Sequence, residues 1–307
     1  MSVLTEGLPS RTAMVTSLMR AAHTRHSRPP LIQDAWADRL LPERLRTLGA
    51  EEILQAAGFF RAWWLRLRLR SRQAIVDYGM RRAPAFGGVI IRQRFTEDAL
   101  AQAVQRGATQ YVILGAGLDS FAWRQPAWAK TIQIFEVDHP ATQQFKQKRV
   151  AACGAGVPPN LHFVAADLAN EPLAVALARS AYRREAVSFV SWLGVTIYLT
   201  RDANLTTLRA VAECCASGSE LAFTYIEQAA LDTPSPGLAR LMASLAAAGE
   251  PWLSGFYAKC LGDDLKAVGL TLVEDLGKAE MLERYCRGRR DGLTPGGGGH
   301  VARARVG

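Results

Sequence analysis

Two glycines, followed some twenty residues later by a carboxylate, are the residues whose types and spacing most clearly suggest chemistry. Gly115 and Gly117 directly follow an apolar run at 111–114, which predicts a buried strand ending in a tight turn where the backbone approaches a ligand. The next apolar run ends with Glu136 and Asp138, 19 and 21 residues beyond Gly117. A carboxylate there can accept hydrogen bonds from two ribose hydroxyls. The pattern indicates a nucleoside site, although Gly-x-Gly also occurs in ordinary strand-to-helix turns.

The residues after the glycine turn indicate which nucleoside would bind. A dinucleotide fold prefers a third glycine, so that a helix N-terminus can hold the pyrophosphate. Here Ser120 takes that position, and Asp119 lies where an anionic phosphate would be. A cationic nucleoside without phosphate fits better, which points to S-adenosylmethionine as the cofactor.

Alternating strands and helices are expected to position these residues. Helical patterns separate a series of short apolar runs, which predicts an α/β fold with a Rossmann-like, doubly wound and mostly parallel sheet. Ligands of such sheets bind outside the carboxyl ends of the strands. The expected strands are 111–114, 132–137, 161–165, 187–192, 220–226 and 270–274. The residues that fall at such ends are Gly115, Glu136, Asp138, Asp167 and Gly194.

The sequence also suggests three regions. Residues 1–106 read as a helical cap or lid, 107–286 as the Rossmann-like cofactor-binding domain, and 287–307, rich in glycine and arginine, as a flexible tail. Helices are expected at about 11–26, 31–48, 51–80 and 87–106. Within 51–80 the Leu-Arg alternation at 65–70 resembles a strand, and Trp63-Trp64 could belong to a membrane-surface helix, a lid or the core.

Composition narrows the class of protein. Residues 1–94 contain 16 Arg, no Lys and 7 Asp or Glu, so they carry the whole net charge of +9. This excess fits either a solvated helical face or attraction of an acidic substrate. Five cysteines without a Cys-x-x-Cys spacing suggest reduced thiols, a cytoplasmic protein and no metal site. We expect no signal peptide, because the first residues lack a basic segment followed by an apolar one. We expect no membrane span, because no apolar run reaches roughly 18 residues.

Several stretches together resemble the leucine carboxyl methyltransferase family, in particular its bacterial class of S-adenosylmethionine-dependent O-methyltransferases. The resemblance covers most of residues 11–227. The stretches that carry it are Pro-Leu-Ile-Gln-Asp-Ala-Trp-Ala-Asp at 30–38, Ile-Arg-Gln-Arg-Phe at 91–95, Leu-Gly-Ala-Gly-Leu-Asp-Ser at 114–120, Phe-Glu-Val-Asp-His-Pro at 135–140, Ala-Asp-Leu at 166–168 and Trp-Leu-Gly-Val-Thr-Ile-Tyr-Leu at 192–199.

The resemblance implies particular roles for residues at the cofactor. It implies that Arg92 binds the methionine carboxylate and that Asp138 binds the ribose. The turn beside the methionine portion would consist of Gly115, Ala116 and Gly117, and the adenine contacts would be Asp167 and Leu168. Two of these residues have structural alternatives, a surface ion pair for Arg92 and a helix N-cap for Asp167. The sequence departs from the family at Leu193, where many members have a glutamate that helps to bind the cofactor's amino group.

The expected activity is methylation of a carboxylate, in a small natural product or at a peptide C-terminus. A carboxylate is ionised at neutral pH and needs no general base, whereas a phenol with a pKa near 10 does. Candidate catalytic residues are Tyr198 and His139, although the first could be core and the second a helix cap. Tyr198 and Arg20 are candidate substrate contacts, and Arg20 could equally be a solvated arginine.

Other functions stay open at this stage. Hydroxyl methylation in secondary metabolism is the alternative, followed by a non-enzymatic S-adenosylmethionine-binding protein and an NAD(P)-dependent oxidoreductase. A nucleic-acid methyltransferase is disfavoured because no Asn-Pro-Pro-Tyr site is present, so no nucleic-acid partner is expected. The sequence does not indicate the oligomeric state.

Overall fold

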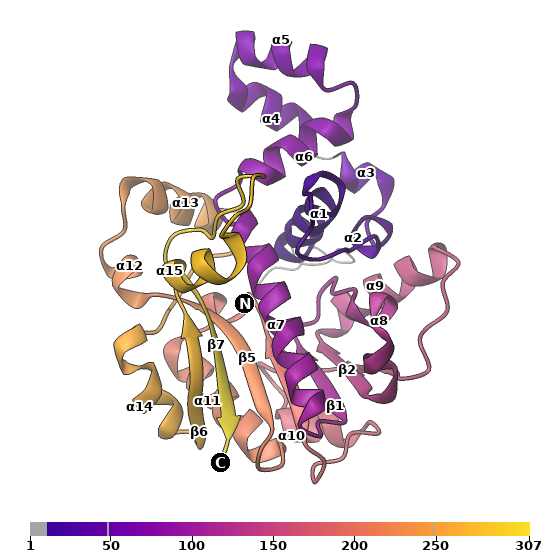
Figure 1. Cartoon of the computed structure of the whole chain (residues 1–307), viewed down its shortest axis with the longest axis vertical. Helices are drawn as coiled ribbons and strands as arrows, with labels where there is room; N and C mark the ends of the chain where they lie inside the picture. The colour runs from indigo at the N-terminus through magenta and orange to yellow at the C-terminus, as the bar shows by residue number, and fades with distance from the viewer. Residues whose placement is uncertain (1–10, 48, 248) are drawn as a thin grey trace.

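The computed structural model describes residues 11–47, 49–247 and 249–307. These residues form one seven-stranded sheet in the order β3-β2-β1-β4-β5-β7-β6 (Figure 1). The strands are β1 (Gln110–Leu114), β2 (Gln133–Asp138), β3 (Leu161–Ala165), β4 (Ser188–Trp192), β5 (Glu220–Ile226), β6 (Leu270–Leu276) and β7 (Gly299–Val306). The predicted fold class, a mostly parallel doubly wound sheet, is confirmed.

The first five strands are parallel, whereas β7 runs antiparallel to both β5 and β6. A dinucleotide-binding sheet has the order 3-2-1-4-5-6, so the inserted β7 separates this fold from that class. The prediction of a flexible tail at 287–307 is therefore wrong for its last part. The alternating arginines of β7 have partners: Arg303 and Arg305 both lie within ion-pair distance of Glu220, which is 2 % exposed.

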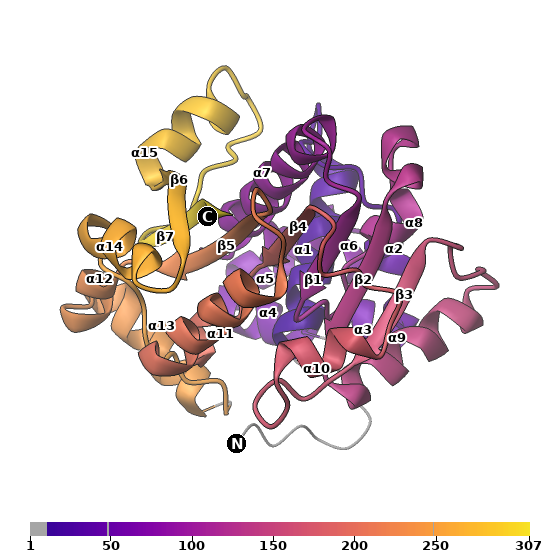
Figure 2. The ribbon, with the colours of Figure 1, turned by 90° about the horizontal axis from the view of Figure 1, so that it is seen from below.

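Helices cover both faces of the sheet (Figure 2). On one face, α7 packs with α8 against side chains such as Tyr111, Ile113 and Ile134. On the other face, α10, α11 and α14 pack against Val112, Val137 and their neighbours. The helices from α7 onward are α7 (Phe86–Gln105), α8 (Phe121–Arg124), α9 (Pro140–Ala152), α10 (Leu173–Ala178), α11 (Arg201–Cys214), α12 (Gln228–Asp232), α13 (Pro236–Ala247), α14 (Leu261–Lys266) and α15 (Lys278–Met281). The described residues also contain short 3-10 or π-helical turns: η1 (Ala127–Thr131), η2 (Thr196–Tyr198), η3 (Ala258–Cys260) and η4 (Leu282–Cys286).

The N-terminal helices form a third packed group. They are α1 (Arg11–His26), α2 (Trp36–Arg39), α3 (Glu43–Arg46), α4 (Ala50–Ala57), α5 (Phe59–Arg68) and α6 (Arg72–Arg82). Their own apolar cluster includes Leu40, Leu54 and Leu65 and reaches Leu118 beside the glycine turn. In contrast, α7 packs along the sheet. The helical segment up to residue 106 therefore contains both helices that pack on one another, α1 to α6, and a helix that belongs to the sheet layer, α7.

The expected helix over 51–80 is divided into three helices. Gly58 adopts a φ of +74° between α4 and α5, a conformation that favours glycine. Leu69 is extended after α5, and the Ser71 hydroxyl then caps α6 by accepting a hydrogen bond from the Ala74 amide at 3.1 Å. As a result α4 and α5 form a hairpin that projects from one end of the molecule (Figure 1). The core interpretation of Trp63 and Trp64 is wrong, because they are 59 % and 47 % exposed.

Candidate functional site

A cavity of about 250 Å³ lies at the carboxyl ends of β1 and β4. Its floor is the turn after β1, and the loop after β4 contributes Leu193, Gly194 and Tyr198. The start of α1 provides Thr12 and other residues, while α7 provides Arg92 and its neighbours. The cavity therefore occupies the position where parallel α/β sheets bind ligands.

The glycine turn has the tight geometry predicted from its sequence. Gly115 and Gly117 adopt φ values of +66° and +51°, which residues with side chains rarely adopt. The Gly115 amide donates to the Val137 carbonyl at 2.9 Å and joins the turn to β2. A Cβ on Gly115 would stand 2.8 Å from Cγ2 of Val195. Glycine is therefore required at 115 both for the backbone conformation and for the approach of the β4 loop.

Asp138 ends β2 and lines the cavity next to this turn. One carboxylate oxygen accepts a hydrogen bond from the Gly117 amide, and the other accepts from the His139 amide at 2.7 Å. Burial raises the pKa of Asp138, against the lowering effect of these two amides. Each carboxylate oxygen can accept a further hydrogen bond, so Asp138 can also bind hydroxyl groups in the cavity.

Arg92 brings an unpaired cation to the same cavity. Among the residues that the structure describes, no carboxylate forms an ion pair with its guanidinium, although many other arginines are paired. Burial, together with the nearby Arg20, lowers the pKa of Arg92 to about 10. Because this value still lies well above 7, Arg92 stays positively charged at neutral pH. A desolvated, charged and unpaired arginine at a cavity wall is suited to binding an anion.

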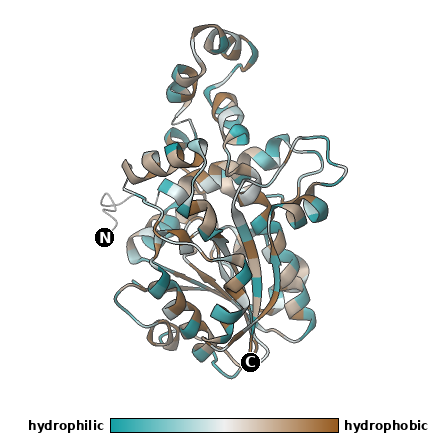
Figure 3. Cartoon of the chain, turned by 90° about the vertical axis from the view of Figure 1, so that its left-hand side faces the viewer, coloured by the Kyte–Doolittle hydropathy of each residue, from teal (hydrophilic) through white to brown (hydrophobic). Residues whose placement is uncertain are grey.

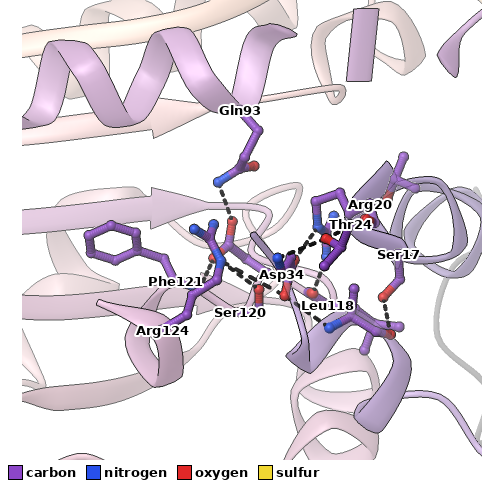
Figure 4. Close-up of polar contacts among 12 residues, drawn as sticks. Ser17, Arg20, Thr24, Asp34, Gln93, Leu118, Ser120, Phe121 and Arg124 are labelled. Carbon is purple, nitrogen blue, oxygen red and sulfur yellow. Dashed lines mark hydrogen bonds and ion pairs between the residues drawn. The ribbon is translucent and has the colours of Figure 1, made fainter. Parts of the chain in front are cut away.

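Arg20, a predicted substrate contact, borders the cavity but is held by protein groups (Figure 4). Its Nε lies 2.8 Å from Oδ2 of Asp34, and its Nη2 donates to the Leu118 carbonyl at 2.6 Å. Burial raises the pKa of Asp34, but Arg20 and Arg124 outweigh this effect and lower it overall. Arg20 thus connects α1 to the end of the glycine turn, and this observed role is structural.

Tyr198 forms part of the cavity wall at the end of η2. Its hydroxyl lies 3.0 Å from Oγ1 of Thr12, which donates to Oε2 of Glu250 at 2.6 Å. Burial raises the pKa of Tyr198, so the phenol is protonated at neutral pH and is suited to donating a hydrogen bond. Sequence reasoning missed Thr12 and Glu250, which come from distant segments and carry no motif.

Other predicted residues do not line the cavity. Glu136 is 1 % exposed and pairs with Lys146 of α9 at 2.5 Å. Glu136 lies two residues before Asp138 on β2, so its side chain is roughly 7 Å farther from the cavity along the strand. His139 caps α9, with Nδ1 accepting from the Ala141 amide at 3.2 Å. Asp167 and Leu168 follow β3. There Asp167 accepts hydrogen bonds from the Ala169 amide and the Asn170 side chain, at 3.1 and 2.8 Å.

Ala116 and Leu193 both line the cavity. Within the described ranges, no group of three His, Cys, Asp or Glu side chains is arranged to hold a metal ion. No helix in those ranges is long and apolar enough to cross a bilayer.

The sheet order, the glycine turn and the carboxylate of Asp138 at the end of β2 define a Rossmann-like fold. A solved protein from Thermobifida fusca YX, which bears the name of a methyltransferase, has a similar fold, with a TM-score of 0.54 at 20% identity over 85% of this chain and 93% of that one. A DUF574 family protein from Streptomyces avermitilis gives a TM-score of 0.53 at 19% identity, covering 71% of this chain and 84% of that one.

The family follows from the sequence comparison. The leucine carboxyl methyltransferase profile matches residues 13–212, and this chain belongs to that family. YktD from Bacillus subtilis, which bears the name of an S-adenosyl-L-methionine-dependent methyltransferase, is 29% identical over 93% of this chain and 94% of its own length. A Mycobacteroides abscessus protein with the same functional name is 33% identical over 69% of this chain and 63% of its own. The protein is thus an S-adenosylmethionine-dependent methyltransferase, as the motifs predicted.

Proposed function

We propose that this enzyme methylates a carboxylate, in a small natural product or at a peptide C-terminus, to give a methyl ester. The observation that carries this proposal is the chemistry of the cavity wall. Its described lining contains no histidine, lysine or cysteine, and its two carboxylates, Asp119 and Asp138, both accept hydrogen bonds from backbone amides. The Tyr198 phenol is protonated. An acceptor that arrives ionised suits such a wall, because it needs no proton removed before it reacts.

We infer three contacts between the cavity and the cofactor. We assign the methionine carboxylate to Arg92, whose buried guanidinium has no acidic partner among the described residues. We assign the ribose hydroxyls to Asp138, and the close backbone approach to Gly115, Ala116 and Gly117. When bound, the cofactor supplies an electrophilic methyl group on a sulfonium. The Leu193 side chain cannot accept a hydrogen bond from the amino group, so we assign that contact to a backbone carbonyl of the glycine turn.

The adenine contact is assigned to Asp167 and Leu168. They follow β3, whose Ala165 is paired with Asp138 in the sheet register, so both lie one strand beyond the ribose carboxylate. The two carboxylate oxygens of Asp167 keep lone pairs beyond their present hydrogen bonds, which an exocyclic amine could use.

The chain's own residues would hold and orient the acceptor. Because Thr12 donates its one hydroxyl proton to Glu250, Tyr198 donates to Thr12 in this structure, and its hydroxyl would turn from Thr12 to donate to an acceptor oxygen. The α1 segment around Thr12 would help to exclude water from the cavity. The arginine-rich N-terminal region would attract an anionic acceptor. We also place the reaction in the cytoplasm, since all five cysteines are unpaired, as expected in a reducing compartment.

Product chemistry tests the proposal. Purified enzyme is incubated with methyl-labelled S-adenosylmethionine and matched panels of carboxylic acids and phenols. The expected product is an ester that releases labelled methanol in mild alkali. A labelled product that resists alkali would show methylation of a hydroxyl group, and the alternative activity would replace this one.

A further inference from the structure

The α4–α5 hairpin carries an unusual exposed surface, separate from the cavity. In α5, Phe59, Phe60, Trp63, Trp64 and Leu67 are 81, 83, 59, 47 and 62 % exposed. Only Leu65 of this helix is fully buried. None of the α5 residues lines the cavity. Among the described residues this helix has the densest group of exposed large apolar side chains, and such groups mark binding surfaces.

These apolar side chains share one face of α5. Successive residues of an α-helix are about 100° apart, so the five side chains occupy an arc of roughly 140°. Leu65 and Ala62 lie on the opposite side, toward the hairpin. The arc is bordered by Arg66 along one edge and by Arg61 and Arg68 along the other. Figure 3 shows hydrophobic and hydrophilic residues side by side on this projecting hairpin.

The segment around this face is strongly basic. Between residues 53 and 76 there is no acidic residue, and the five arginines there, Arg61, Arg66, Arg68, Arg70 and Arg72, are all exposed. Glu51 of α4 forms ion pairs with two of these arginines, at 3.4 Å from Arg66 and 3.2 Å from Arg72. The guanidinium of Arg68 lies 5.7 Å from the ring centre of Trp64. If Trp64 enters an apolar layer, the long Arg68 side chain can keep its charge at the polar boundary.

We propose that α5 docks this enzyme on the surface of a membrane rich in anionic lipid. A helix with aromatic residues and leucine on one face, bordered by arginines, lies in the headgroup region with its apolar face in the acyl boundary. Trp side chains favour that depth, and arginines at the edges are attracted to anionic headgroups. The convex, projecting position of α5 lets it reach a flat surface without moving the cavity walls.

Charge argues against a second copy of this chain as the occupant. A two-fold contact through α5 would place the same basic surface of both copies together, and like charges at short range repel. A single-stranded nucleic acid would also contact arginines and aromatic rings, but such sites line a groove that follows the backbone. Here the side chains project from a convex helix.

Vesicle binding tests the proposal independently of the methylation chemistry. The full chain is mixed with phosphatidylcholine vesicles that contain either no phosphatidylglycerol or about 30 %, and binding is followed by co-sedimentation and tryptophan fluorescence. We expect binding with a blue shift only to the anionic vesicles, weakened by salt. The double variant W63S/W64S should lower partitioning at least tenfold, and R61Q/R68Q should lower it by about fivefold for each arginine removed.

Matched controls use similar residues elsewhere on the surface. Val157 and Val175 are each 51 % exposed, so V157S/V175S removes exposed apolar side chains outside α5. The exposed Arg209 and Arg240 give the charge control R209Q/R240Q. Both controls should bind vesicles like the unmodified chain, and every variant should keep its thermal shift with S-adenosylhomocysteine. Absence of binding to anionic vesicles would overturn the proposal, as would unchanged binding of W63S/W64S. A dimer or an oligonucleotide complex that depends on Trp63 and Trp64, without vesicle binding, would also overturn it.

Discussion

The guanidinium of Arg92 rests directly on the backbone of Gly194, so that a Cβ at this glycine would stand 2.8 Å from both Nη atoms. Gly194 itself has a φ of +72°. The loop after β4 thus forms one wall of the space in which Arg92 is held, and the cavity geometry depends on glycine at this position.

Replacing Gly194 by alanine should displace Arg92 and weaken binding of S-adenosylhomocysteine by about tenfold or more, the scale of losing hydrogen bonds to a charged group. Calorimetric titration measures this change. Gly292→Ala is the matched control, because Gly292 has the same φ of +72° and an added Cβ would meet no atom within 4 Å. Equal affinities in the two variants would mean that the Gly194–Arg92 contact does not matter for binding.

The buried pair of Glu136 and Lys146, each 1 % exposed, should behave as a unit. At about pH 8, above the pKa of Glu136, Glu136→Gln or Lys146→Met alone leaves one buried charge without its partner, at a cost of about 3–5 kcal/mol in the free energy of unfolding, whereas the double change should cost far less. Denaturant unfolding of the four proteins gives the coupling energy. Additive single effects would contradict the pairing.

The same pair should make stability depend on pH. Burial raises the pKa of Glu136 from 4.5 to about 7, although Lys146 opposes this. The folded state then holds a proton that the unfolded state has already released. Unfolding free energy should therefore fall as pH rises from about 4.5 to 7. Melting scans across this range should show a smaller fall in the double variant, and an identical fall would exclude Glu136 as the group.

Turnover should be nearly flat between about pH 6 and 9, since an acid acceptor is ionised throughout this range. His139 caps α9, so His139→Gln should lower stability by about 1 kcal/mol and lower kcat by much less than the roughly hundredfold loss expected for a general base. A steep rise of rate through pH 7 that disappears in this variant would instead indicate base catalysis of hydroxyl methylation.

The sequence predicted those parts of the site that depend on local pattern. The glycine turn and Asp138 lie at the ends of neighbouring strands, so spacing located the turn and offered Glu136 and Asp138, and the family resemblance then indicated Asp138 for the ribose. Glu136 has the same residue type and lies on the same strand. Its burial depends on Lys146 of α9, which no spacing rule includes. Contacts such as Thr12 with Glu250 join segments 238 residues apart and were not predictable.

At two places the structure differs from what the sequence predicted, and each difference has a physical reason. In β7, glycines precede arginines, which is typical of a loop in sequence, but Glu220 of β5 compensates the charge of Arg303 and Arg305. In α5, Trp63 and Trp64 have the composition of a core segment, but Gly58 and the extended Leu69 separate the helix from its neighbours. Both outcomes depend on tertiary partners rather than on local preference.

Cofactor recognition by Arg92 and Asp138 is tested most directly by titrating two ligands into two variants. S-adenosylhomocysteine carries the amino-acid portion, whereas methylthioadenosine has the same nucleoside without the carboxylate. We predict that Arg92→Gln weakens binding of the first ligand by about 10- to 100-fold and leaves the second unchanged, the scale of a lost charged hydrogen bond, while Asp138→Asn weakens both. If Arg92→Gln affected both ligands equally, or neither, Arg92 would not bind the carboxylate and the assignment of this cavity would be contradicted.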